Sequence, residues 1–509
     1  MSTEYLILLG LAIPLTGSVL ILLTGNWPNL REFVTLATAV SLFAVVVQLV
    51  PEVNAGGRPG VTLIQLLPGL EIRFEIEPLG MMFACVSSGL WIINSFYSIG
   101  YMRAHHERKQ TRFYACFALA IFGAFGVATA GNMLTLFFFY EVLTISTYPL
   151  VAHSETEEAK QSARIYLGLL MGTSIGLQLI AIVWTWFATG TLDFRDGGII
   201  SGHVEGALVS VLLLLYMYGI GKAALMPFHR WLPTAMVAPT PVSALLHAVA
   251  VVKAGVFTVL KVVIYIFGPA TLASGEAGEW LLYIAGFTVI AASCVALTKD
   301  NLKARLAYST VSQLSYIVLG AAIATPWAIM GAAMHIAMHA LGKITLFFCA
   351  GAIMVATHKT NVSQMDGLGR KMPFTMLAYL IGALCVIGVP PLGGFWSKWH
   401  LVSGAFDAGM WLVVTVFLVS TLLNVAYLLP PVVRAFLLPP KPEDEAHDHG
   451  NDHAHGGDGG AAKGGIQEAP LFCVVPLCLT ALGSIALFFY VEPLMGLLQG
   501  IFDAGGWTR

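Results

Sequence analysis

Residues 386–400 read VIGVPPLGGFWSKWH, an apolar run in which two prolines and three glycines interrupt helical hydrogen bonding. Residues 217–233, MYGIGKAALMPFHRWLP, are interrupted in the same way by two glycines and two prolines. Each run carries one lysine, Lys398 in the first and Lys222 in the second. A broken helix at membrane depth persists only where it lines a cavity or faces other protein. The two runs therefore predict two broken transmembrane helices inside a larger helical bundle.

The rest of the chain is equally apolar. Of its 509 residues 57% are apolar and 11% are charged, against about 25% charged in a soluble domain, which excludes a large water-soluble enzyme. The net charge of −2 argues against nucleic acid as a partner. Apolar runs of roughly 20 residues, the length that crosses a bilayer, recur about fourteen times. They predict an all-α polytopic membrane protein with spans near 4–24, 30–50, 78–100, 113–130, 132–152, 162–188, 206–229, 242–268, 279–298, 304–324, 327–356, 373–400, 409–436 and 470–498.

The charges in the connections predict the orientation, because Lys and Arg are retained on the cytoplasmic side. With the N-terminus outside, most basic residues lie in cytoplasmic connections, and the opposite side holds only Arg58, Arg73, Arg195 and Arg509. This bias supports fourteen spans and places both termini outside. The first run has no basic residue before it and is too long for a signal-peptide core, so we expect residues 4–24 to be a span.

The two broken spans are the seventh and the twelfth, five apart. A repeat of five spans is inverted in topology because five is odd, so we predict two inverted five-helix repeats near 112–268 and 279–437. Residues 439–465 contain HDHGNDHAHGGDGGAAKGG and predict a disordered His/Asp/Gly-rich cytoplasmic loop. The alternative for this loop is a transition-metal site formed by His447, His449, His453 and His455.

Five lysines fall inside apolar runs: Lys222, Lys253, Lys261, Lys343 and Lys398. A lysine at mid-bilayer costs about 2.5–3.5 kcal/mol, and Glu141, in LTLFFFYEVLTIS, is the only acid near the middle of a span. We therefore expect some of these amines to be neutral part of the time and to exchange protons. Glu141 is predicted to hold a nearby lysine charged, the alternative being a protonated or hydrogen-bonded structural acid. Lys261 lies nearer the outer end, and we expect it only to snorkel.

His335, His339 and Lys343 fall at i, i+4 and i+8, so they form a row along one helix face. We interpret the row as a proton relay; the alternatives are packed structural histidines or ligands of haem or zinc. His247 and Lys253 on the eighth span extend the same polar line.

Sequence motifs for cofactors are missing. No GxGxxG follows a strand, no CxxC is present, and HALGKIT lacks the upstream glycine of a phosphate loop. No cofactor or metal site is predicted. The chain is therefore expected either to exchange one ion for another or to receive energy from a partner subunit.

Four stretches of the chain together are typical of one known family. They are GKAALMPFHRWLPTAMVAPTPVSALLHAVAVVKAGVF, KDNLKARLAYSTVSQLSYIVLG, HIAMHALGKITLFFCAG and VPPLGGFWSKW. On these stretches the chain resembles the proton-conducting antiporter-like family, over about residues 75–437. This family comprises complex I (NADH–quinone oxidoreductase) subunits L, M and N, Mrp-type Na+/H+ antiporter subunits A and D, and relatives in membrane-bound hydrogenases. The resemblance implies fourteen helices with two inverted five-helix repeats, in a bacterial inner membrane, and it favours a D-type or N-type subunit.

The same resemblance implies roles for individual residues. Glu141 and Lys222 match the Glu–Lys pair of spans five and seven, and His247 and Lys253 match the ionisable residues of span eight. The family's row of ionisable residues in the second half corresponds to His335, His339 and Lys343. Its terminal ionisable residue in span twelve corresponds to Lys398. The implied partners are other membrane subunits, protons with Na+ or K+, and peripheral redox subunits.

Two other classes of function compete with a proton-translocating subunit. A stand-alone secondary transporter of a small solute or ion needs a polar substrate pocket, and the sequence shows a line of titratable groups instead. A quinone- or haem-bearing redox enzyme needs cofactor ligands that are not evident. Co-purification separates the three classes. Other membrane subunits bound to the chain would support a proton-translocating subunit, activity of the lone chain would support a stand-alone transporter, and a bound chromophore would support a redox enzyme.

Overall fold

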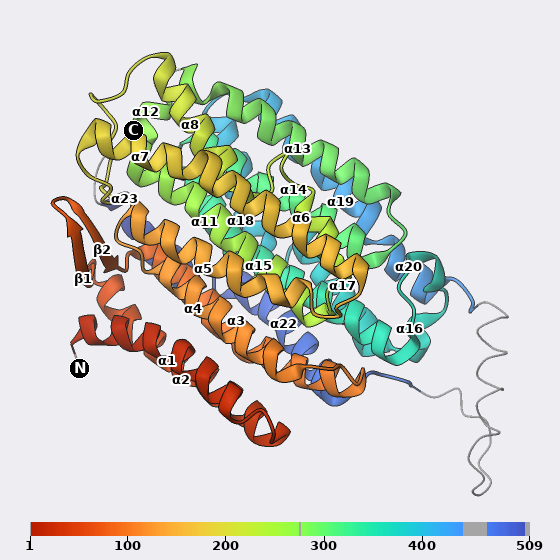
Figure 1. Cartoon of the computed structure of the whole chain (residues 1–509). Helices are drawn as coiled ribbons and strands as arrows, with labels where there is room; N and C mark the ends of the chain where they lie inside the picture. Colours follow the sequence, from red (N-terminus) through yellow and green to blue (C-terminus); the bar gives the residue numbers. More distant parts are fainter. Residues whose placement is uncertain (1, 274–275, 441–465, 504–509) are drawn as a thin grey trace, which may run out of the picture.

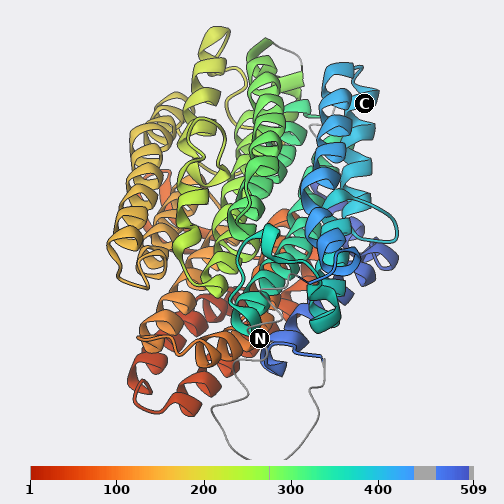
Figure 2. The same ribbon diagram turned by 90° about the vertical axis from the view of Figure 1, so that its right-hand side faces the viewer.

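The computed structural model describes residues 2–273, 276–440 and 466–503. Most of them lie in long helices that run side by side in one bundle (Figures 1 and 2). The helices and strands are α1 (Thr3–Leu23), α2 (Pro28–Asn54), β1 (Gly60–Leu67), β2 (Leu70–Glu75), α3 (Pro78–Ala104), α4 (Gln110–Ala128), α5 (Met133–Val151), α6 (Glu157–Thr173), α7 (Leu179–Thr189), α8 (Ala207–Gly219), α9 (Trp231–Thr234), α10 (Thr240–Ala244), α11 (Val251–Lys261), α12 (Pro269–Ala273), α13 (Glu279–Thr298), α14 (Leu302–Ile323), α15 (Pro326–Thr357), α16 (Leu368–Lys371), α17 (Pro373–Ile387), α18 (Gly394–Asp407), α19 (Trp411–Leu428), α20 (Pro430–Leu437), α22 (Leu471–Phe489) and α23 (Glu492–Asp503). Wider π-helical turns are η1 (Ser174–Gln178), η4 (Leu245–Val249) and η5 (Val262–Phe267), and tighter 3-10 turns are η2 (Gly221–Ala223), η3 (Ala235–Val237), η6 (Glu276–Gly278) and η7 (Val362–Gln364).

Within the described ranges, twelve helical segments are long and apolar enough to cross a membrane. Eleven of them match predicted spans within a few residues, and the twelfth begins with the last predicted span but ends before it, so an all-α polytopic membrane protein is confirmed. The number fourteen stays a prediction, because the other two predicted spans contain the shorter helices α8 and α17. The last predicted span is too long: α22 ends at Phe489, and Pro493, which cannot continue a helix, lies in the first turn of α23.

Both short helices end where the glycines and prolines predict a break. Helix α8 ends at Gly219 and gives way to the turn η2, and α17 is followed by Gly388, whose φ of +92° disfavours residues other than glycine. After the second break, Gly394 begins α18 so close to α17 that a Cβ there would overlap the carbonyl oxygen of Cys385. The breaks in spans seven and twelve are therefore confirmed.

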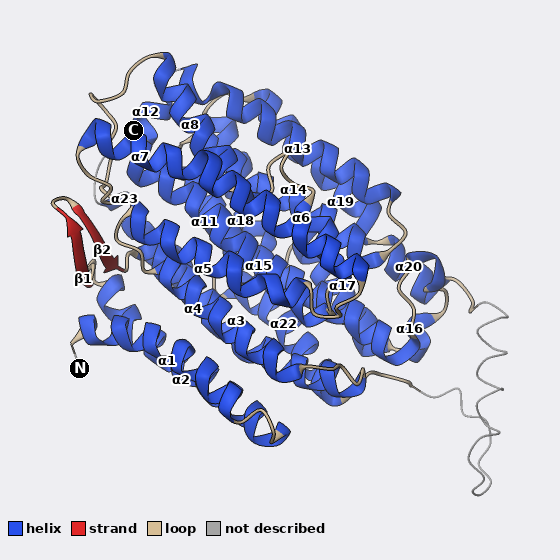
Figure 3. Cartoon of the chain, viewed as in Figure 1, coloured by secondary structure: helices blue, strands red, loops and turns tan. Residues whose placement is uncertain are grey.

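A β-hairpin lies between α2 and α3, where no element is predicted. Strands β1 and β2 pair antiparallel around a turn at Gly69, whose φ is +79° (Figure 3). Leu63, Ile64 and Leu66 are exposed on β1, so the strand has no clean alternation of apolar and polar residues to reveal it in the sequence. Gly500 of α23 approaches Pro78, so the described C-terminal helix lies at the same end of the bundle as this hairpin.

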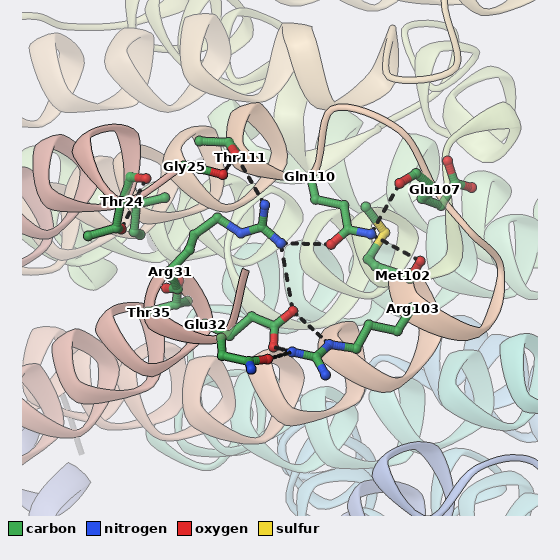
Figure 4. Close-up of polar contacts among 12 residues, drawn as sticks. Thr24, Gly25, Arg31, Glu32, Thr35, Met102, Arg103, Glu107, Gln110 and Thr111 are labelled. Carbon is green, nitrogen blue, oxygen red and sulfur yellow. Dashed lines mark hydrogen bonds and ion pairs between the residues drawn. The ribbon is translucent and has the colours of Figure 1, made fainter. Parts of the chain in front are cut away.

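The opposite end, which we call the basic end, carries Arg31, Arg103 and Lys303 at the ends of α2, α3 and α14. Figure 4 shows how polar contacts join its connections. The Arg31 guanidinium donates to Gln110 Oε1 at 2.8 Å, and Arg103 Nε donates to Glu32 Oε1 at 3.0 Å. These contacts tie the α1–α2 connection to the α3–α4 connection.

Candidate functional site

Lys222 lies in the break of span seven and is fully buried. Its amine donates to the carbonyl oxygen of Tyr140 at 2.8 Å and to Thr144 Oγ1 at 2.6 Å, and lies 3.1 Å from the centre of the Tyr140 ring. Helix α11 packs directly on this turn, because a Cβ on Gly255 would overlap the carbonyl carbon of Lys222. The Lys222 amine therefore points toward α5, and the backbone of the same turn packs against α11.

Glu141 lies next to this site but does not contact the amine. Its two carboxylate oxygens are buried and have no hydrogen-bond partner among the described residues, and no ion pair with Lys222 occurs there. The residue is partly exposed, on a stripe of α5 between the exposed side chains of Phe138 and Ile145. Within the described residues Glu141 and Lys222 therefore form no ion pair, and the Lys222 amine is bound to neutral oxygens.

Lys253 connects the two halves of the chain. Its amine lies 2.7 Å from Nδ1 of His339, so α11 and α15 meet through a buried hydrogen bond between two basic groups. Two bases can share this hydrogen bond only if one of them supplies a lone pair, which requires at least one of them to lack a proton. The contact is therefore suited to proton exchange.

The ring of His247, in η4, packs 4.7 Å from the ring of Phe347. Both of its nitrogens are buried and have no hydrogen-bond partner within the described part of the chain. His247 and Lys253 are both fully buried, so neither is a surface residue.

The row on α15 is buried along its whole length. The ring centres of His335 and His339 lie 5.5 Å apart, and His335 Nδ1 lies 2.9 Å from Ser397 Oγ, next to Lys398 in the sequence. Lys343 donates to Ser309 Oγ at 2.7 Å. The row thus contacts α14 and α18 on either side.

Lys398 follows the break in span twelve and forms the far end of the site. Its amine donates to the carbonyl oxygen of Ile387 at 3.1 Å, an acceptor at the end of α17. It also lies 4.7 Å from the ring centre of Tyr316, whose ring stacks on His335 at 5.8 Å. A series of contacts therefore connects Lys398 to Lys253 through Tyr316, His335 and His339.

Lys261 does not snorkel, contrary to the expectation. It is 1% exposed and forms an ion pair of 2.8 Å with Glu77, which also accepts from the hydroxyl of Tyr265. Glu77 caps the start of α3 and accepts hydrogen bonds from the backbone of Leu79 and Gly80. The partner is distant in sequence and belongs to another helix, which is why sequence reasoning missed it.

Sequence reasoning also missed the neutral groups that hold the amines and the imidazoles. These are Tyr140, Thr144, Ser309, Gln313, Tyr316 and Ser397. Hydroxyl and amide groups inside apolar spans are the available signal, since they pair across helices in membranes. In the described ranges no three His, Cys, Asp or Glu side chains gather as a metal site, and His447, His449, His453 and His455 lie outside those ranges.

The chain matches known proteins over most of its length. Residues 130–424 match the family described as NADH:quinone oxidoreductase/Mrp antiporter, TM. NADH-quinone oxidoreductase subunit N of Desulforudis audaxviator is 32% identical over 427 residues, covering 81% of this chain and 82% of that protein. NAD(P)H-quinone oxidoreductase chain 5 of Synechocystis sp. is 32% identical over 364 residues, but these cover only 52% of its length.

Two solved structures share the fold. A chain of the Mrp complex from Dietzia sp. DQ12-45-1b superposes with a TM-score of 0.84 at 23% identity, covering 98% of this chain and 97% of that one. A chain of an archaeal membrane-bound sulfane sulfur reductase superposes with a TM-score of 0.84 at 22% identity, covering 99% and 98%. With the family match, these findings show that the chain belongs to the NADH:quinone oxidoreductase/Mrp antiporter transmembrane family.

Proposed function

We propose that this chain is a proton-translocating membrane subunit of a multi-subunit complex, either an Mrp-type cation/proton antiporter or a complex I-like NADH–quinone oxidoreductase. One observation carries the proposal: the buried, contact-connected series from Lys398 through His335 and His339 to Lys253. A protein that only needed to fold would replace these costly groups by apolar ones. Its relatives named above are subunits of quinone oxidoreductases, which supports partner membrane subunits.

The relay consists of the eight residues predicted above: Glu141, Lys222, His247, Lys253, His335, His339, Lys343 and Lys398. A proton leaves one nitrogen as a neighbouring lone pair accepts it, and the change of charge alters the proton affinity of the next group. Two unit charges about 7 Å apart interact by roughly 2.4 kcal/mol at an effective dielectric of 20. That is roughly a fiftyfold change in proton affinity, enough to drive a transfer between matched groups.

The wider organisation is part of the same proposal. Two inverted repeats near 112–268 and 279–437 each have their break in the fourth of five spans, which agrees with a repeat. The membrane is a bacterial inner membrane, and the basic end faces the cytoplasm because Lys and Arg collect there. Na+ or K+ is the exchanged ion in the antiporter form, and peripheral redox subunits supply energy in the oxidoreductase form.

The test is proton transport by the complex that contains this chain, reconstituted in liposomes with an internal pH dye. Lys253→Met removes the amine that joins the halves, and we expect at least a tenfold slower rate with normal assembly. Ser88→Ala is the matched control, because this buried hydroxyl donates to its own helix at Ala84.

A stand-alone secondary transporter is the second candidate; it predicts transport by the purified lone chain.

A further inference from the structure

A cavity of about 540 Å³ lies at the basic end, between the α1–α2 connection, the end of α3 and the start of α4. Figure 4 shows most of the side chains that surround it. Its lining includes three cations, Arg31, Arg103 and Lys109, and two carboxylates, Glu32 and Glu107. None of the eight relay residues lines this cavity, so it has no part in the site described above.

Arg31 is the buried cation of this lining. It is 4% exposed, and its guanidinium donates to Gln110 Oε1 at 2.8 Å and to Thr111 Oγ1 at 3.1 Å (Figure 4). The guanidinium carbon lies 5.2 Å from the ring centre of Tyr114. The remaining nitrogen, Nε, is buried and has no hydrogen-bond partner among the described residues. A buried donor without an acceptor is costly, so the free Nε indicates an acceptor that the chain itself does not supply.

The N-terminus of α4 borders the same cavity, through its first two residues, Gln110 and Thr111. The first backbone N–H groups of a helix have no partner within it, and no described side chain caps α4. The first turn contains no acidic residue, whereas Lys109 precedes it and Arg112 lies in it. Glu155 pairs with both of these cations but lies outside the cavity lining. Free N–H groups and the positive end of the helix dipole favour an anion at this place.

The two carboxylates of the lining do not supply the missing acceptor. Arg103 Nε donates to Glu32 Oε1 at 3.0 Å, and the same oxygen lies 3.7 Å from Arg31 Nη2, too far for a hydrogen bond. Glu107 Oε2 lies 3.7 Å from Nε2 of His153. An acceptor for the Arg31 Nε therefore has to come from outside the described part of the chain.

The cavity lies where α2 meets the end of the membrane-spanning bundle. Pro28, which lines the cavity, is the first residue of α2. Close to it Trp27, Leu30 and Phe33 are 61%, 45% and 66% exposed. Large apolar side chains exposed at the end of a membrane-spanning helix face lipid, with tryptophan at the level of the headgroups. A phospholipid whose acyl chains lie along α2 thus has its phosphate beside the cavity.

We propose that this cavity binds the phosphate of an anionic phospholipid, with Arg31 and the N-terminus of α4 as the donors. Arginine forms charge-assisted hydrogen bonds to phosphate oxygens, and basic pockets between membrane helices hold anionic headgroups. The bound lipid joins the α1–α2 connection to the α3–α4 connection. The inference does not depend on proton transport, because it concerns none of the relay residues.

The test is binding of phosphatidylglycerol to the full chain, purified in detergent and measured by native mass spectrometry. Thr111→Asp and Thr111→Asn have nearly the same shape, keep an oxygen acceptor for Arg31 and differ by one negative charge. Aspartate near a helix N-terminus stabilises the helix, so the fold tolerates it. We expect Thr111→Asn to retain one tightly bound lipid that Thr111→Asp binds at least tenfold more weakly, at equal unfolding temperature. Equal affinities would overturn the inference.

A second set of variants tests the buried cation itself. Arg31→Gln removes the charge, and we expect it to bind the lipid at least tenfold more weakly than the natural chain. Arg31→Lys keeps a charge and should retain part of the affinity. Lys160→Gln is the control for loss of a cation, because this exposed side chain pairs with Glu157 on its own helix. Natural affinity in Arg31→Gln would contradict the proposed site.

Two other probes identify the occupant. Phosphatidylcholine carries a phosphate without net charge, and inorganic phosphate carries no acyl chains. We expect phosphatidylglycerol to bind at least tenfold more tightly than either. Saturable binding of inorganic phosphate without binding of phosphatidylglycerol would overturn the lipid as the occupant. Equal binding of the two lipids would overturn the requirement for an anionic headgroup.

Discussion

The amine of Lys253 lies 2.7 Å from Nδ1 of His339, and this is the point where the two halves of the chain meet through titratable groups. The two residues are 86 positions apart, on α11 and α15. Through the stacked rings of His339 and His335 the contact continues towards Lys398. In the proposed relay, a proton that crosses between the halves passes through this hydrogen bond.

Replacement of Lys253 by arginine tests whether the amine must release its proton. Arginine keeps the positive charge but does not deprotonate in proteins, so Lys253→Arg should slow proton transport by the reconstituted complex at least tenfold, the same result that we expect for Lys253→Met. Full activity of the arginine variant would show that charge alone suffices at this position.

Loss of the amine in the first break should stop transport without affecting assembly. In Lys222→Ala, Thr144 and the carbonyl of Tyr140 lose a donor but remain neutral, so the fold tolerates the change. We expect transport near the background of empty liposomes and a normal yield of complex. Thr144→Ser keeps the hydroxyl acceptor and serves as the control. Normal pumping by Lys222→Ala would remove this residue from the relay.

A carboxyl group at the far end should retain part of the function. A protonated Glu side chain in Lys398→Glu can still donate to the carbonyl oxygen of Ile387, the acceptor that Lys398 uses. Lys398→Met cannot donate and should be inactive. The measurement is the transport rate of both variants at matched assembly; complete loss in Lys398→Glu would mean that the positive charge is required there.

The ion pair between Lys261 and Glu77 should contribute to stability and not to transport. Removal of one partner leaves a buried charge unpaired, which costs about 3–5 kcal/mol. Lys261→Met should therefore lower the unfolding temperature of the detergent-purified protein, and the double variant with Glu77→Gln should regain part of it. If the double variant is as unstable as Lys261→Met, the loss of the ion pair is not the cause of the lower unfolding temperature.

The connection after α5 should lose stability in mild acid. Burial, assisted by Arg112, lowers the pKa of His153 to about 4, against about 6.5 in an unfolded chain. Between these values the unfolded state binds more protons, so stability falls as the pH falls from 6.5 to 4. The melting temperature should drop more steeply from about pH 7 to about pH 4.5 in the natural chain than in His153→Phe. If the melting temperature falls with pH equally in both proteins, His153 is not the source of the acid sensitivity.

Sequence reasoning succeeded where the cause is local. Prolines and glycines remove helical hydrogen bonds at their own positions, so the breaks beside Lys222 and Lys398 could be predicted and are confirmed. Apolar runs long enough to cross a membrane could also be located, because their length is read from consecutive residues. The β1–β2 hairpin was missed because its exposed leucines give no alternating pattern.

The sequence by itself determined that ionisable residues lie at membrane depth, and that His335, His339 and Lys343 share one helix face, because helical periodicity is a local property. Only the tertiary structure decided which of these groups meet. Lys253 contacts His339 and Lys261 pairs with Glu77, whereas Glu141 forms no ion pair with Lys222 among the described residues. Such contacts depend on how distant helices pack together, and no spacing along the chain records that packing.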